Sequence, residues 1–157
     1  MLAFVVLTAA SSFAAVHAAN FTYCSEIGSV SISTITLDPE ELVVGQSVQV
    51  NVTGETKVAA ENPVIAVDVT HEGVSYLNNV QVELCYLPDN YSESGDQIIE
   101  CPIGAGRFQY SFPSPVVPTI VPSGKYGLTL NLADGGGPLV CVRLNVTVVS
   151  GAQTSLR

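Results

Sequence analysis

Residues 140–148 have the sequence Val-Cys-Val-Arg-Leu-Asn-Val-Thr-Val, in which branched apolar side chains occupy every second position. Successive side chains of a β-strand point to opposite faces, so this alternation predicts a strand with one face buried and one in solvent. Residues 126–132 repeat the pattern with Tyr and three Leu, and the Gly- and Pro-containing cluster 134–138 between the two stretches predicts a turn. This part of the chain therefore predicts paired, half-buried strands.

The same alternation recurs toward the N-terminus, in the segments 30–37, 48–52, 65–69, 80–84 and 108–112. Its phase slips at Ser33-Thr34, which predicts a β-bulge. Asp38 followed by Pro39 is a helix-start signal, and a single helical turn is expected there. The pattern predicts an all-β fold, an immunoglobulin-like antiparallel β-sandwich of seven to eight strands. An antibody-type domain is disfavoured because the chain has no Trp.

Composition excludes several classes of protein. The 157 residues contain 5 Lys and Arg against 14 Asp and Glu, for a net charge of −9, and 47% of them are hydrophobic. Such a chain is too apolar to be intrinsically disordered. It has too few cations to bind nucleic acid or to be attracted to an anionic membrane by a polybasic segment.

The first nineteen residues have the features of a secretory signal peptide. An uncharged apolar run centred on residues 4–7 is followed by small residues up to Ala19, and the run is too short to span a bilayer. We therefore expect residues 1–19 to be a signal peptide and residues 20–157 to form one domain.

The cysteine pattern agrees with secretion. Cys24, Cys85, Cys101 and Cys141 are an even set without Cys-x-x-Cys spacing. His71 is the single histidine after the signal, so a zinc site is disfavoured and no metal is expected. Two disulfides are predicted in an oxidising compartment, and three connectivities are possible.

Four Asn-x-Ser/Thr sequons are candidate glycosylation sites, at Asn20, Asn51, Asn90 and Asn145. Asn51 and Asn145 both fall on the polar phase of their predicted strands. A glycan on either would therefore point to solvent.

A search for catalytic groups gives no convincing site. His71 lies beside Glu72 and Gly73 without a nucleophile-elbow motif, and is interpreted as a surface histidine. The glycines 135–137 precede a predicted strand and not a helix, so they indicate a turn and not a phosphate-binding loop. Most acidic residues lie in predicted loops. The residues do not predict an enzyme, and no cofactor is expected.

The predicted inner faces suggest a binding role. They are mostly valine, which fills less volume per position than Leu or Phe, so the two sheets could leave an apolar cavity between them. An ordinary packed sandwich is the alternative that composition alone favours.

The C-terminal half adds a resemblance. The Cys, Pro and Gly residues that separate the predicted strands, with their neighbours, are Cys101-Pro102-Ile103, Pro118, Pro122-Ser123-Gly124-Lys125-Tyr126, Asp134-Gly135 and Cys141, and Tyr23-Cys24 and Gly45-Gln46-Ser47-Val48 lie upstream. Their order resembles the ML lipid-recognition domain family, which includes the secreted Niemann-Pick type C sterol carrier and fungal phosphatidylglycerol/phosphatidylinositol transfer proteins. The resemblance covers essentially the whole mature chain, and the stretch 101–141 is its most specific part.

This resemblance implies an apolar ligand between the sheets and disulfides that join Cys24 to Cys141 and Cys85 to Cys101. It places the ligand entrance at the proline-rich linker. The expected lipid-binding residues are those of the linker region and of the predicted inner faces: Phe112, Val117, Val121, Tyr126, Val67, Tyr110, Leu128 and Val142. The chain departs from the family in the long spacing between Cys85 and Cys101, which implies an insertion near the rim of the pocket.

The expected function is that of a monomeric carrier of a sterol or phospholipid, secreted or in the lumen of a vacuole or lysosome. It would make transient contact with a membrane or a membrane protein. One alternative is a module that presents lipid to a receptor or acts in adhesion. A hydrolase that uses His71 or a pair of acids is a further one.

Overall fold

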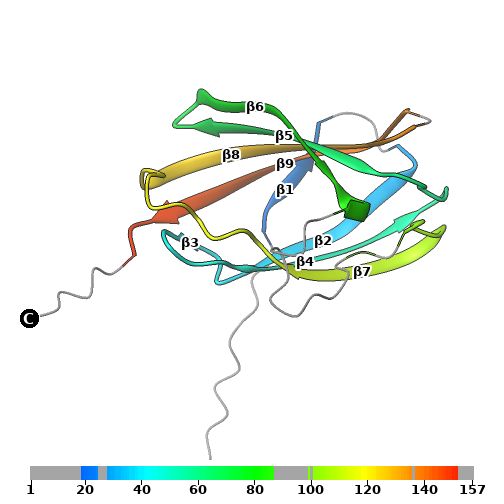
Figure 1. Cartoon of the computed structure of the whole chain (residues 1–157), viewed down its shortest axis with the longest axis horizontal. Coiled ribbons are helices and arrows are strands. Elements are labelled where there is room, and N and C mark those ends of the chain that lie inside the picture. Colours follow the sequence, from blue (N-terminus) through cyan, green and yellow to red (C-terminus); the bar gives the residue numbers. More distant parts are fainter. Residues whose placement is uncertain (1–18, 25–27, 87–98, 100, 136, 152–157) are drawn as a thin grey trace, which may run out of the picture.

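The computed structural model describes residues 19–24, 28–86, 99, 101–135 and 137–151. Two β-sheets lie face to face over most of this part of the chain (Figure 1). Each sheet presents the apolar phase of its strands to the other, as the alternation in the sequence predicts. The fold is an all-β sandwich.

The smaller sheet has three strands in the order β2 (Val30–Asp38), β4 (Gln49–Thr56) and β7 (Gly106–Pro113), all antiparallel. The register between β2 and β4 shifts between Ile32 and Thr34. This confirms the bulge predicted from the phase slip at Ser33-Thr34.

The larger sheet has six strands. Its main order is β1 (Phe21–Tyr23), β9 (Gly137–Val149), β8 (Gly124–Asp134), β5 (Val64–His71) and β6 (Val74–Glu83). The remaining strand, β3 (Leu42–Val43), pairs with the end of β9 and is parallel to it. A single turn of 3-10 helix, η1 (Leu84–Tyr86), follows β6.

Seven of the described strands have eight residues or more, and β1 and β3 are short. The helical turn expected at Asp38 is wrong: the chain bends through Pro39 to Glu41 without helix. Since β3 follows at once and pairs with β9, its extended backbone takes precedence over the local helix-start signal.

The sandwich has two distinct ends. At the linker end lie the β5–β6 hairpin, the beginning of β8 and residues 114–123, the linker, which connects β7 to β8 (Figure 1, left). At the opposite end, here called the disulfide end, β8 turns into β9 and β6 runs into η1.

Two clusters of buried side chains hold the sheets together, and both are centred on β9. Tyr23 adds a polar link between the sheets, because its hydroxyl donates to the carbonyl oxygen of Ile32 and accepts from the Ile32 N–H, both at 2.8 Å. The packed part of the interior therefore lies under β9, toward β1 and β2.

Candidate functional site

The inner face of the larger sheet becomes progressively less covered from β9 to β6. Val142, Leu130, Val67 and Val80 are successive cross-strand neighbours on β9, β8, β5 and β6. Val142 is 4% exposed, Leu130 and Val67 are half-buried, and Val80 is 42% exposed. The interior is thus packed on one side and open on the other.

The next row of cross-strand neighbours lies two residues nearer the linker end on β9, β8 and β5. It shows the same rise in exposure toward β6. Leu144 is 5% exposed, its neighbours Leu128 and Val69 are half-buried, and Leu77 on β6 is 45% exposed. The cause is the unequal width of the sheets, since three strands cannot cover the inner faces of six. Strands β5 and β6 therefore present apolar side chains that no opposing strand covers.

Side chains of β7 face this uncovered area from the smaller sheet. Phe108, Tyr110 and Phe112 alternate with exposed residues and are themselves half-buried, and the first two rings are stacked with their centroids 5.4 Å apart. Phe112, like Val67, packs against neither buried cluster. The apolar side chains of β5, β6 and β7 on this side of the interior are therefore only partly covered.

The eight expected lipid-binding residues divide into three groups. Val142 and Tyr126 are buried members of the two packed clusters. Half-buried residues at the margins of those clusters are Tyr110, Leu128, Val117 and Val121. Val67, on the uncovered face of β5, and Phe112, on β7 of the smaller sheet, belong to neither cluster, so a ligand at these two residues would displace the fewest packing contacts.

Sequence reasoning predicted the second part of β6, in the segment 80–84, but assigned no lipid-binding residue to this strand and missed its first part. The register between β5 and β6 shifts twice, between Val67 and Val69 and again between Val69 and Thr70. Asn79 takes a positive φ of 50° at the first shift, and its N–H donates to the Asp68 carboxylate at 2.7 Å. The resulting bulges interrupt the alternation around Tyr76 and Leu77, and the sequence carries no period-two signal that could have found them.

The linker is tied to the loop that follows β3. The N–H of Val117 donates to the carbonyl of Gln46 at 3.0 Å, and the carbonyl of Val117 accepts from the N–H of Gly45 at 2.8 Å. Val117 and Val121 pack inward against the second buried cluster, while Val116 and Ile120 point outward. The linker thus closes one side of the linker end.

His71 is not the surface residue expected from the sequence. Its ring stacks on Tyr126 with the centroids 4.5 Å apart, and its Nε2 is buried without a hydrogen-bond partner in the described structure. The ring occupies the space that a side chain at Gly124 would need, because a Cβ there would lie 2.6 Å from Nε2. The register that pairs His71 with Tyr126 brings the imidazole inside, and a local sequence pattern cannot show that.

Tyr126 joins this aromatic group to the linker. Its hydroxyl donates to the carbonyl oxygen of Pro122 at 2.8 Å. Burial raises the pKa of the Tyr126 hydroxyl, and the nearby Tyr76 and Glu72 raise it further. The neutral hydroxyl therefore persists at physiological pH and holds the end of the linker against β8.

Comparison with known proteins gives the family. The sequence model of the ML domain matches residues 18–148. The chain belongs to the ML domain family. A comparison with curated protein sequences found no match.

Solved structures of ML-type proteins have the same fold as this ML domain. A Niemann-Pick type C2 protein from the Japanese carpenter ant aligns with a TM-score of 0.57 and 15% identity, over 83% of this chain and 99% of that one. Chicken MD-1, solved in complex with lipid IVa, aligns with a TM-score of 0.58 and 16% identity, over 81% of this chain and 86% of that one. Family membership makes this protein a lipid-binding domain and not an enzyme.

The disulfides of this ML domain are those that the resemblance implies. Cys24 is bonded to Cys141 and Cys85 to Cys101, and no cysteine in the described residues is free. Disulfides of this kind persist in oxidising compartments, which points to an extracellular or lumenal protein.

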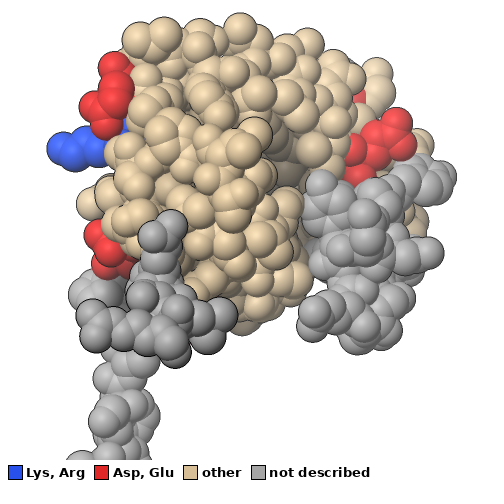
Figure 2. All heavy atoms as spheres, turned by 60° about the vertical axis from the view of Figure 1, so that its left-hand side comes forward, with Lys and Arg blue, Asp and Glu red and all other residues tan. Residues whose placement is uncertain are grey.

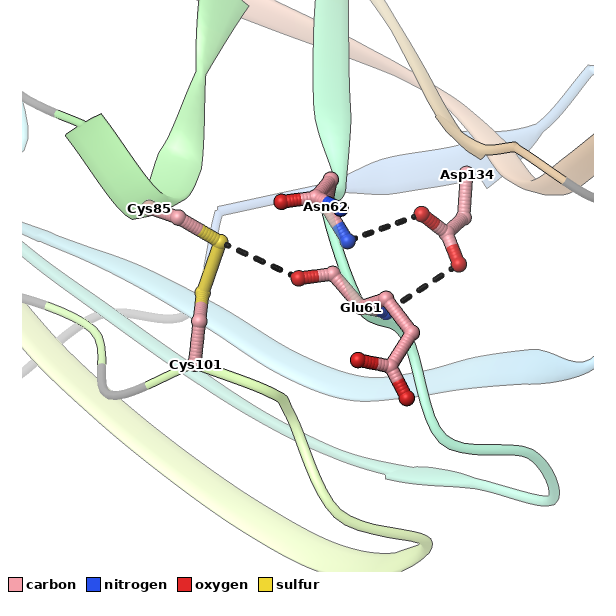
Figure 3. The surroundings of a disulfide bond; sticks show 5 residues. All are labelled: Glu61, Asn62, Cys85, Cys101 and Asp134. Carbon is pink, nitrogen blue, oxygen red and sulfur yellow. Dashed lines mark hydrogen bonds between the residues drawn. A yellow bond between two sulfur atoms is a disulfide. The ribbon is translucent and has the colours of Figure 1, made fainter.

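A carboxylate fastens the disulfide end (Figure 3). Asp134 accepts hydrogen bonds from the backbone N–H groups of Asn62, at 3.0 Å, and Glu61, at 3.1 Å. These bonds hold the pKa of Asp134 below its ordinary value. The Glu61 carbonyl faces Cys85 Sγ at 3.7 Å, so one loop touches both the disulfide and the β8–β9 turn.

The sequons differ in their surroundings. Asn145 on β9 and Asn20 are exposed. The Asn51 side chain is half-buried in the middle strand of the smaller sheet, where it donates to Thr36 Oγ1 at 3.3 Å and accepts from Ser111 Oγ at 2.6 Å. Asn90 lies outside the described residues.

Within the described ranges, no three His, Cys, Asp or Glu side chains are grouped so that they could hold a metal ion. No helix in that part of the chain is long and apolar enough to cross a bilayer.

Proposed function

We infer that this ML domain is a secreted or lumenal carrier that holds a sterol or phospholipid between its sheets and transfers it between membranes. One observation supports this most strongly: the exposure of the inner face rises from 4% at Val142 to 42% at Val80 along a single cross-strand row. An acyl chain or sterol ring system placed against this row would remove from water apolar surface that the fold leaves uncovered.

The free energy of this burial scales with area. Apolar surface removed from water contributes roughly 25 cal/mol per Å², so covering about 200 Å² of protein surface would contribute roughly 5 kcal/mol before the costs of ordering the ligand. The lipid-binding residues in this proposal are Val67, Phe112, Tyr110, Leu128, Val117 and Val121, with Tyr76, Leu77 and Val80 added from β6. Val142 and Tyr126 belong to the packed clusters and would mainly support these lipid-binding residues.

The polar head of the ligand would lie at the linker end, where the chain is not closed by disulfides. Residues 1–19 would direct the chain into the secretory pathway, to the extracellular space or to the lumen of a vacuole or lysosome. The monomer would act without a cofactor, and glycans on Asn145 or Asn20 would point away from the ligand. Chicken MD-1, which is similar in fold, was solved with lipid IVa, and this supports an amphipathic lipid as the ligand.

Transfer between vesicles tests the proposal. Purified protein is mixed with donor vesicles that contain a fluorescent sterol or phospholipid and with unlabelled acceptors. Protein-dependent transfer with no other protein present is the expected result. Stable lipid binding without transfer would favour a lipid-presenting module that acts through a receptor, and no binding of either lipid would refute the proposal.

A further inference from the structure

Two apolar side chains stand at the tips of two turns at the linker end. Val74 follows the β5–β6 turn, whose central residues Glu72 and Gly73 both have positive φ, and it is 70% exposed. Ile120 lies in the turn of residues 118–121, which the Val121 N–H closes on the Pro118 carbonyl at 3.0 Å, and it is 84% exposed. No other large hydrophobic side chain in the described residues is as exposed as these two.

Hydrogen bonds of the backbone and of two side chains hold the two turns at the same end of the molecule. The Glu72 N–H donates to the Lys125 carbonyl at 3.0 Å, and the Glu72 carboxylate accepts from the Lys125 N–H at 2.9 Å. The hairpin is thereby fixed to the first residues of β8, directly after the linker. The Tyr126–Pro122 hydrogen bond fixes the linker to the same strand.

This end is continuous with the open part of the interior. Tyr76 and Leu77, which border the uncovered inner face, follow Val74 on β6 and are 43% and 45% exposed. Figure 2 looks toward this end and shows a mostly uncharged surface that is hollowed near its middle, with the charged residues at its margins. A lipid that moved along the inner face of β6 would emerge between the two apolar turns.

The charge of the protein indicates which kind of bilayer it would bind. Across the whole chain the net charge is −9, so an anionic bilayer repels the protein at low ionic strength. The tips themselves are apolar, and the charged groups beside them are the Glu72 carboxylate and the exposed Lys125, whose backbone N–H donates to that carboxylate. These two local charges offset each other, so the net charge of the whole chain favours a bilayer without net charge over an anionic one.

We propose that Val74 and Ile120 form a membrane anchor that inserts into a zwitterionic bilayer and places the open interior against it, so that lipid enters and leaves without a receptor. This inference rests on the proposed function and names the surface through which it operates. Two aliphatic side chains make a weak and reversible anchor, which suits contact that lasts only as long as one exchange.

The test compares V74T/I120T with the wild type. Both substitutions keep β-branched side chains at exposed positions, so the fold is expected to be unchanged. The matched control is V58T, because Val58 is 42% exposed and lies beyond the end of β4, at the disulfide end. Binding to phosphatidylcholine vesicles is measured by flotation, and the transfer rate is measured against acceptor vesicle concentration.

For the wild type and V58T, the transfer rate is expected to rise with acceptor concentration. Phosphatidylserine in the acceptors is expected to slow transfer at low salt, and added salt should restore the rate. In V74T/I120T, flotation and transfer are expected to fall by about tenfold, because the hydroxyl of each Thr replaces an apolar group that would enter the bilayer.

Loading with a fluorescent sterol added from solvent distinguishes the anchor from the lipid site. The double variant is expected to load as well as the wild type. Unchanged flotation and transfer in the double variant would overturn the anchor and leave the lipid site intact. Transfer that required a membrane protein would also overturn it, in favour of a receptor. Failure of the wild type to load any lipid would instead refute the proposed function.

Discussion

Placing a phenylalanine at position 67 tests whether the interior near β5 is open. Val67 and Val142 lie in one cross-strand row, separated by Leu130, and differ mainly in how well they are covered. Extra carbon atoms forced into a packed core cost about 1–3 kcal/mol. V142F should therefore lose about that much stability, which for a domain of this size is a fall in Tm of roughly 4–12 °C.

V67F should behave differently because its ring has open space to enter. Val67 packs against neither buried cluster, and its neighbour Val80 is 42% exposed. The expected change in the free energy of unfolding of lipid-free protein is within about 0.5 kcal/mol. The ring would fill space that the lipid needs, so binding of a fluorescent sterol or phospholipid should weaken by about tenfold or more.

Both variants are measured by thermal and urea unfolding of delipidated protein, followed by lipid titration. If V67F lost as much stability as V142F, the face of β5 would be packed and the proposed site would be wrong. If V67F kept both stability and wild-type lipid affinity, the ligand would have to bind elsewhere.

Three further changes probe the rest of the fold. D134N removes a carboxylate whose pKa is lowered in the folded state, so the variant should have a lower Tm than the wild type at pH 7. In a pH series, the difference in Tm between the two proteins should disappear as the pH falls through the folded pKa of Asp134, because protonation removes the same interaction from the wild type. Y126F removes the hydrogen bond to Pro122 and should cost about 1 kcal/mol in urea unfolding at pH 7. Because the pKa of Tyr126 is raised, the stability linked to its protonated form is lost as pH rises through that value, so Y126F should flatten the alkaline limb of the stability profile. Replacing Cys24 and Cys141 by Ser opens a loop with a sequence separation of 117, and the loop-entropy relation gives a loss of roughly 5 kcal/mol, seen as unfolding at lower urea.

Local periodicity was sufficient to predict the seven long strands at least in part, but not the short strands β1 and β3 or the first part of β6. The alternation in residues 140–148 corresponds to β9, in which Val140, Val142, Leu144, Val146 and Val148 are all buried. The phase slip at Ser33-Thr34 located a bulge because an extra residue changes the face of every later side chain. Even here a local signal could fail, as the expected helical turn at Asp38 shows.

The same pattern could not predict how far each side chain of the inner face is exposed. Periodicity states which face a side chain points to, but the exposure of Val67 or Val80 depends on how many strands the opposite sheet contains. The sandwich pattern alone therefore placed Val142 and Val67 in one set, although one is packed and the other open. The pairing of His71 with Tyr126 is likewise a property of register between distant strands.

The central claim is that the uncovered inner face of this ML domain carries a lipid. Native mass spectrometry of protein purified from its own secretory pathway tests it most directly, since bound lipid appears as an added mass. The account predicts a wild-type population with one added mass in the range of a sterol or phospholipid, and a largely empty V67F. A wild-type protein that is consistently empty, and that extracts no lipid from vesicles, would contradict it.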